Sequence, residues 1–208
     1  MKKIADILSI IFHPVFISTY GLILYTVYLF EKNIPLTITA YMILYAITIL
    51  LTCLIPLSTL ISYDKDKKQF DRDKLYLERK EDRLKPYLIS LLCALLWGAT
   101  MWRHNKLIGI LLLGVAIGFI CLIAINYKWK ISAHLFFFGS LTGCIIGFSL
   151  LTSCYPLWLI ETMFILALTL MWARIFGKHH SQEQVVAGYL LGLLCPVISA
   201  ACYMWAFM

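Results

Sequence analysis

Long apolar runs alternate with short polar segments along most of the chain. Because about 20 apolar residues in a helix span the hydrocarbon core of a bilayer, each run predicts one transmembrane helix. We therefore expect an all-α fold, a polytopic transmembrane bundle of about six or seven spans that forms a single integral-membrane domain over residues 1–208. The runs cover residues 15–30, 34–61, 87–102, 107–127, 131–155, 157–176 and 185–208.

Three segments depart from a simple span. The run 34–61 is long enough to tilt or kink, and Pro56 is the expected site of the kink. The run 87–102 is short, which predicts a re-entrant or strongly tilted segment. Residues 1–14 begin with two lysines and end at His13-Pro14, and no small-residue cleavage site follows them. This pattern predicts an interfacial helix rather than a cleaved signal peptide.

Composition supports a membrane protein and excludes an ordinary soluble domain. The chain is 62% apolar and 14% charged, with a mean hydropathy of +0.85, whereas soluble domains are about half apolar and about a quarter charged. The expected partner is the lipid bilayer and not nucleic acid. Seven cysteines lie within or beside apolar runs without any CxxC pair, so we interpret them as small buried hydrophobic residues rather than metal ligands.

Glycines recur every four residues in three of the predicted spans. This spacing places small residues on one stripe of a helix, where it lets transmembrane backbones approach closely. We therefore expect a tightly packed bundle. The glycines are Gly114 and Gly118, then Gly139, Gly143 and Gly147, and finally Gly188 and Gly192.

The basic residues are distributed unevenly between the two sides that seven spans would create. Fifteen of the eighteen Lys and Arg residues fall before the first span or in the loops after the second, fourth and sixth. The positive-inside rule places this side in the cytoplasm. We expect the protein in a bacterial inner (plasma) membrane, with those loops cytoplasmic.

The same three loops carry the polar clusters whose side chains are suited to catalysis or to binding. In the third, Arg174 precedes His180 by six positions and Gln184 follows it by four. A helix that begins near Ser181 would place His180 and Gln184 on one face, so that the amide holds one ring nitrogen of the histidine. The alternative is a hydrated loop whose histidines lie at the headgroup level.

The other two clusters suit an anion. Ser132 fits a helix N-cap, and His134 follows in the first turn, where free N–H groups bind phosphate oxygens. The loop 64–86 ends in Arg79, Arg83 and Lys85, whose like charges favour an anion between them, although a basic loop that only sets topology fits equally well. Because all three loops share one side, their side chains have the opportunity to form one site.

These clusters, in this order, resemble the type 2 phosphatidic acid phosphatase superfamily. The family pattern is K-x6-R-P, then P-S-G-H, then S-R-x5-H-x3-D. The chain has Ala173-Arg174-x5-His180-x3-Gln184 for the third motif, Ile131-Ser132-Ala133-His134 for the second, and a degenerate first motif that ends at Lys85-Pro86. The likeness covers roughly residues 79–192, and a core of this kind would occupy residues 79–208.

The resemblance implies a membrane phosphatase that hydrolyses a lipid phosphate or pyrophosphate without a metal or other cofactor. His180 would attack phosphorus to form a phosphohistidine, and His134 would protonate the leaving oxygen. The phosphate oxygens would be held by Arg174, Ser132, Arg79, Arg83 and Lys85.

One departure from the family pattern affects the chemistry. Gln184 stands where the family has an aspartate, and an amide cannot offset the charge of a developing imidazolium, so the rate should suffer. Glu183 offers a substitute carboxylate, either beside Gln184 or in a register shifted by one residue, in which it follows His179 by four positions. The alternative function is a catalytically impaired protein that binds an anionic lipid headgroup. A small transporter is disfavoured, because no apolar run carries an ionisable residue at its middle.

Overall fold

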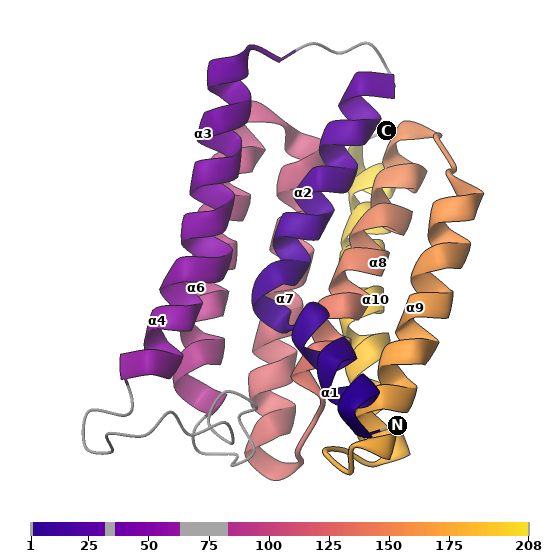
Figure 1. Cartoon of the computed structure of the whole chain (residues 1–208). Coiled ribbons are helices and arrows are strands. Elements are labelled where there is room, and N and C mark those ends of the chain that lie inside the picture. The colour runs from indigo at the N-terminus through magenta and orange to yellow at the C-terminus, as the bar shows by residue number, and fades with distance from the viewer. Residues whose placement is uncertain (1, 32–35, 63–82, 208) are drawn as a thin grey trace.

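The computed structural model describes residues 2–31, 36–62 and 83–207, and within them the regular structure is helical with no strand. Figure 1 shows the helices side by side in one bundle, with α1 lying across one end. The elements are α1 (Lys2–Ile11), α2 (Pro14–Glu31), α3 (Ile38–Ile49), η1 (Leu50–Leu54), α4 (Ile55–Ser62), α6 (Leu84–His104), α7 (Lys106–Lys128), α8 (Ala133–Thr152), α9 (Leu157–Phe176) and α10 (Gln182–Phe207).

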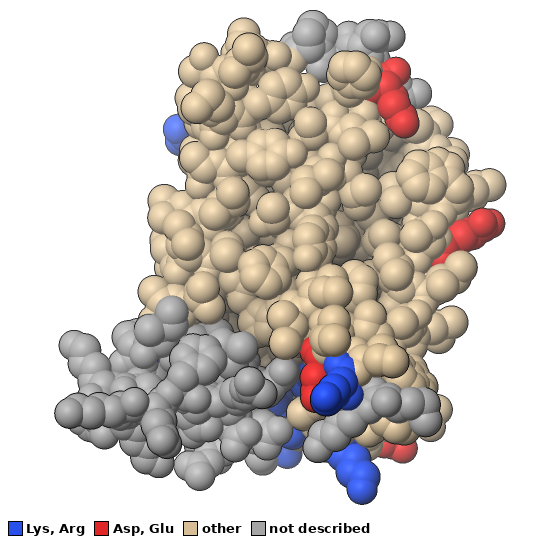
Figure 2. Space-filling model, viewed as in Figure 1, with Lys and Arg blue, Asp and Glu red and all other residues tan. Residues whose placement is uncertain are grey.

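Seven helical segments of the described chain are long and apolar enough to cross a membrane. They are α2, the continuous unit Ile38–Thr59, α6, α7, α8, α9 and α10. The predicted all-α bundle is confirmed, and the protein is an integral membrane protein. On the face drawn in Figure 2, uncharged side chains cover most of the surface and most Lys and Arg side chains gather at the lower end.

The third span is not short, which corrects the sequence-based expectation of a re-entrant segment. Helix α6 has 21 residues and extends beyond the apolar run at both ends. Lys85 and Pro86 lie in its first turn, where a proline is tolerated because its missing N–H would have no intrahelical partner. Arg103 and His104 form its last turn.

The second span is distorted where the sequence predicted a kink. Five residues, Leu50–Leu54, adopt a π-helix, and the N–H of Ile55 donates to the carbonyl of Leu50, five residues back. Pro56 follows directly, and its ring would clash with the carbonyl of Thr52 in a regular α-helix. The wider turn before Pro56 is the local solution to that clash.

Helices α8 and α10 form the central contact of the bundle, and glycines make it possible. A Cβ added at Gly139 or Gly143 would collide with the backbone of α10, at Tyr189 or Leu193. Gly192, on the other helix, lies in the same way against the carbonyl of Phe136. The glycine stripes therefore serve close packing, as predicted.

This contact brings the first turns of α8 and α10 together. A Cβ at Gly188 would lie 2.6 Å from the carbonyl oxygen of Ser132, and the N–H of Ser132 donates to the carbonyl of Gln184 at 3.2 Å. In Figure 1 the end of α4, the start of α6 and the α7–α8 and α9–α10 connections all lie at the end of the bundle that carries α1. The described ends of these three loops therefore lie at one end of the bundle, as expected, whereas residues 63–82 lie outside the described part of the chain.

We expect Gly192→Ala to lower the free energy of unfolding by about 1–3 kcal/mol, because the new methyl group meets the backbone of Phe136, which cannot rotate away. Gly21→Ala is the matched control, since its Cβ would meet only the Cδ1 atom of Leu141, the end of a flexible side chain, at 3.0 Å. Thermal unfolding of the two variants in detergent measures the difference. Equal stabilities would contradict the close α8–α10 approach.

Candidate functional site

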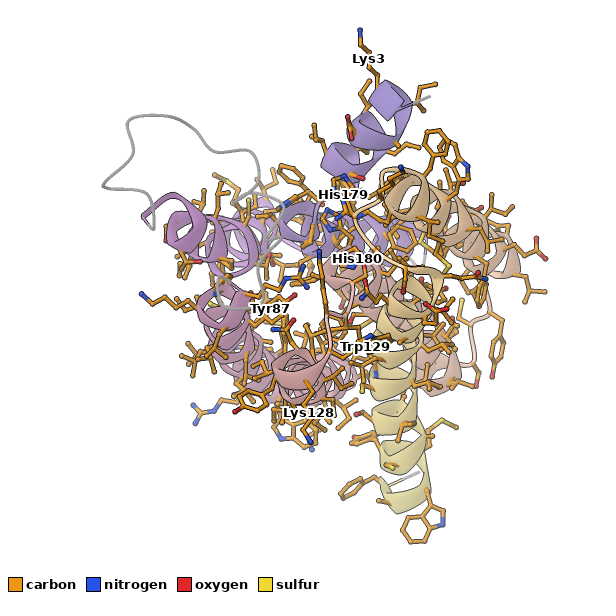
Figure 3. All side chains as sticks on the ribbon, turned by 90° about the horizontal axis from the view of Figure 1, so that it is seen from below. Lys3, Tyr87, Lys128, Trp129, His179 and His180 are labelled. Carbon is orange, nitrogen blue, oxygen red and sulfur yellow. The ribbon has the colours of Figure 1, made fainter. Side chains whose placement is uncertain are left out.

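A pocket opens at the end of the bundle that carries the three polar clusters. With the space at its mouth it has a volume of about 600 Å³. Figure 3 looks at this end and shows His180 and Tyr87 toward the middle of the bundle, whereas Lys3 and Lys128 lie at its edge. The lining residues are His13, Pro14, Val15, Thr52, Pro56, Arg83, Pro86, Tyr87, Ser90, Ala133, His134, Phe137 and His180.

A tight turn between α9 and α10 positions both Arg174 and His180. Arg174 lies in the last turn of α9 and is only 1% exposed. The N–H of His179 donates to the carbonyl of Arg174 at 3.2 Å, and Lys178 has a left-handed backbone with φ of 58°. This left-handed residue ends the helix and reverses the chain, so that His180 returns to the pocket.

The hydrogen bonds of Gln184 fix the tautomer of His180. Its Oε1 atom accepts from the backbone N–H of Ser181 at 3.2 Å, which identifies that atom as the amide oxygen. The same oxygen lies 3.0 Å from Nδ1 of His180 and can only accept there. Nδ1 therefore carries the proton, and Nε2 keeps its lone pair. The predicted i, i+4 contact is confirmed.

His134 has the same tautomer for a different reason. It is hydrogen-bonded to the backbone of Ser9 in α1, and within the described residues its Nε2 atom has no hydrogen-bond partner. The bond is therefore made by Nδ1. Because the N–H of Ser9 is used within α1, the carbonyl is the group that accepts, and Nε2 of His134 also keeps its lone pair.

Cations surround the two histidines. Arg83 is 2% exposed, lines the pocket and donates to the carbonyl of Ile131 at 3.0 Å. Arg174 interacts electrostatically with both His134 and His180. None of the described residues that line the pocket is acidic. The pocket therefore favours an anion.

Burial, followed by the charge of Arg174, lowers the pKa of His180 from 6.5 to about 3, and the hydrogen bond to Gln184 opposes this change only in part. His180 is therefore neutral at physiological pH. Because the unfolded chain binds this proton near pH 6.5 and the folded chain only near pH 3, stability is lost as the pH falls below about 6.5.

The remaining predicted site residues lie further from the pocket. Ser132 occupies the N-cap position without a side-chain cap bond, is fully buried, and its N–H is used by Gln184. Lys85 is exposed on α6. Glu183 is exposed and accepts from Ser181 Oγ at 2.6 Å, so Gln184 is the residue that orients His180. Arg79 lies outside the described residues.

Sequence reasoning missed four polar residues of the pocket, His13, Thr52, Tyr87 and Ser90. His13 sits between α1 and α2 and packs edge-on against His134, with ring centroids 5.4 Å apart. Tyr87 and Ser90 extend from the first turns of α6 into the same space. The sequence signal for His13 was its position directly before Pro14 at the start of a span. The residue before a proline has a restricted backbone and marks a helix boundary.

The arrangement presents two lone-pair nitrogens and the guanidinium of Arg83 to one pocket, and the charge of the buried Arg174 acts on both imidazoles although Arg174 does not line the pocket. Lone pairs require a hydrogen-bond donor and cations require an anion, so the matching ligand is an oxyanion that still carries a proton. Although three histidines line the pocket, no three His, Cys, Asp or Glu side chains of the described residues group so as to hold a metal ion.

Comparisons with protein-family models, with curated proteins and with solved structures find no match for this chain. Inference about function therefore rests on the chemistry of the pocket.

We expect His180 of the wild-type protein to stay neutral between about pH 5 and about pH 8, as its pKa of about 3 requires. Gln184→Asp should raise that pKa by about one to three units, because a carboxylate stabilises the imidazolium. Nitrogen-15 NMR of histidine-labelled protein in micelles measures both values. A wild-type titration near 6.5 would contradict the buried, cation-flanked position.

Proposed function

We propose that the protein is a membrane phosphatase that hydrolyses a lipid phosphate or pyrophosphate through a phosphohistidine on His180. One observation carries the proposal: Nε2 of His180 and Nε2 of His134 both hold lone pairs in a pocket that Arg83 lines, and the charge of Arg174 acts on both rings. A nucleophilic nitrogen, a second proton acceptor and fixed cations are the groups that phosphoryl transfer needs from a protein.

Phosphate fits this site better than other common anions. A carboxylate or a sulfate ester is fully deprotonated near neutral pH and offers no donor to the two imidazoles. A phosphate monoester has its second pKa near 6, so an appreciable fraction still carries a proton. The ligand thus supplies both the negative charge and the proton for which the pocket is built.

The walls of the pocket support a lipid as the carrier of the phosphate. Pro14, Val15, Pro56 and Phe137 give the pocket apolar surface. The span that contains Pro56 is the least buried of the seven, with 6% of its residues inside the bundle. Because Thr52 and Pro56 of this span also line the pocket, an acyl or prenyl chain that packs along the exposed span would end beside the pocket.

In the first step, Nε2 of His180 attacks phosphorus as the bond from phosphorus to the lipid oxygen breaks. The proton that the phosphate brought passes through Nε2 of His134 to the leaving oxygen, which departs as an alcohol. Water then attacks the phosphohistidine, and the bond from phosphorus to Nε2 of His180 breaks. Nε2 of His134 takes a proton from that water and passes it to a phosphate oxygen, so that dihydrogen phosphate leaves and both histidines recover their lone pairs. Arg83 and Arg174 balance the charge on the phosphoryl oxygens in both steps.

The order of the motifs agrees with membership in the type 2 phosphatidic acid phosphatase superfamily, which works without a metal. Gln184 is the exception, since it orients His180 without adding negative charge. That exception favours the second candidate, a protein that binds an anionic lipid headgroup and does not turn it over.

We expect purified protein to release inorganic phosphate from lipid phosphates in the presence of EDTA. His180→Asn should abolish the release, because the nucleophilic nitrogen is lost, with a fall of at least about 10³-fold. His179→Asn is the matched control and should retain activity. Binding of a lipid phosphate without any release would favour the headgroup-binding protein, and loss of activity only in His179→Asn would move the nucleophile by one residue.

The side on which the site lies follows from charge. Fifteen of the eighteen Lys and Arg residues lie before the first span or in the loops on the side of the membrane that carries the site. Eleven of them remain when Arg79, Arg83, Lys85 and Arg174 are left out. The positive-inside rule then favours a cytoplasmic site in a bacterial inner membrane.

A single cysteine introduced in the loop 64–86, in a variant without the seven native cysteines, should resist a membrane-impermeant thiol reagent in intact cells. The same cysteine should react after the cells are permeabilised. A second variant with its cysteine in place of Ser153, at the opposite end of the bundle, should react in intact cells. The reverse pattern would place the site outside.

A further inference from the structure

We propose that the C-terminal end of α1 is a working part of the site, in which the Ser9 carbonyl and the His13 ring hold His134 with its proton on Nδ1 and its lone pair on Nε2. The inference rests on the proposed function for its catalytic meaning, but the positioning itself does not require turnover. Nothing in the sequence motifs includes residues 1–14, so this role comes from the fold.

The carbonyl groups at the end of α1 can be accounted for one by one. A helix leaves its last four carbonyls without intrahelical partners. Leu8 accepts from the N–H of Phe12 at 2.9 Å, Ile10 from the N–H of His13 at 3.1 Å, and Ile11 from the hydroxyl of Tyr20 at 2.8 Å. The carbonyl of Ser9 is the fourth, and the imidazole of His134 is its partner.

The hydrogen bond to the Ser9 carbonyl fixes the ring proton of His134 on Nδ1. A neutral histidine exchanges its proton between the two ring nitrogens, and the hydrogen bond made by one nitrogen decides which form is present. A carbonyl oxygen accepts only, so the nitrogen that faces Ser9 must be the protonated one. The partial negative charge at the C-terminal end of α1 also stabilises a transient imidazolium.

His13 restrains the ring from a second direction. Its imidazole lies edge-on to that of His134 with an interplanar angle of 88°. Its Nδ1 atom lies 3.4 Å from the backbone nitrogen of Val15, the donor in this contact, at the start of α2. Because the joint between α1 and α2 holds it, His13 limits the rotation of His134 that would break the bond to Ser9.

The rest of α1 is built to dock on the bundle at this point. Ala5 and Ser9, one helical turn apart, are each 1% exposed, so they lie on the side of α1 that packs against the bundle. Phe12 packs edge-on against Phe138 of α8 at 5.5 Å. Ile7 is 56% exposed, which places it on the outer side of α1. Inner and outer positions of one short helix therefore provide a matched pair for a test.

Histidine tautomers of labelled protein in micelles, read by nitrogen-15 NMR, test this proposal directly. We expect His134 in the wild type to be protonated at Nδ1. Ala5→Gln places a polar amide under α1 and should shift His134 toward the Nε2-protonated form. Ile7→Gln adds the same side chain on the outer face and should leave the tautomer unchanged. The His180 signal reports in each spectrum that the α9–α10 turn is intact, because Gln184 fixes it independently of α1.

The proposal is overturned if wild-type His134 is protonated at Nε2. It is also overturned if Ala5→Gln leaves the tautomer of His134 unchanged although α1 has moved. Labelling of a cysteine placed at Ser9 reports that movement. This readout needs no substrate, so its result is separate from the phosphatase assay. If phosphate is released, Ala5→Gln should also lower kcat by about tenfold or more relative to Ile7→Gln, since general acid–base groups contribute on the order of 10²–10⁴ in rate.

Discussion

The backbone-to-backbone contact of α8 and α10 is the constraint on which the site depends. Neither helix carries a complete set of functional groups, because His134 begins one and His180 precedes the other. Gly188 and Gly192 remove the side chains that would separate the helices near this end. Transmembrane helices gain little from apolar burial against one another, so close contact supplies the attraction, and the same contact sets the distance between the two histidines.

Hydrogen bonds to oxygen atoms determine which nitrogen of each imidazole carries the proton. Gln184 holds His180 from the following helix, and Ser9 holds His134 from a helix that lies across the bundle end. Both acceptors are neutral. A buried carboxylate next to His180 would offset the charge of Arg174 and leave the imidazole partly protonated, and a protonated imidazole is not a nucleophile. Neutral acceptors keep both lone pairs available before any ligand arrives.

Much of this structure was predictable from the sequence, for identifiable reasons. Hydrophobic length gave the spans, glycine spacing gave the tight packing, and i, i+4 spacing gave the contact of His180 with Gln184, because each depends only on local geometry. The predicted length of the third span was wrong, because the apolar run leaves out the first and last turns of α6, which contain the polar residues Lys85 and Arg103. The contacts of His13 and Ser9 depend on how α1 folds back over the bundle, which no local pattern contains.

For the phosphoryl transfer that we propose, Gln184 has opposite consequences in the resting site and in the transition state. Without a carboxylate, burial and Arg174 keep the pKa of His180 at about 3, so the ring is neutral and Nε2 carries no proton at neutral pH. The positive charge that would develop on His180 during attack is then stabilised only by the amide oxygen and by the incoming phosphate. A dianionic phosphoryl group is itself a strong counter-charge in a buried site. The substrate can therefore supply part of the stabilisation that an aspartate would give, and a substrate with more negative charge gains more from this exchange. For the proposed reaction, a pyrophosphate that keeps one proton would therefore react faster than a singly charged ester, because it brings more negative charge to the developing imidazolium.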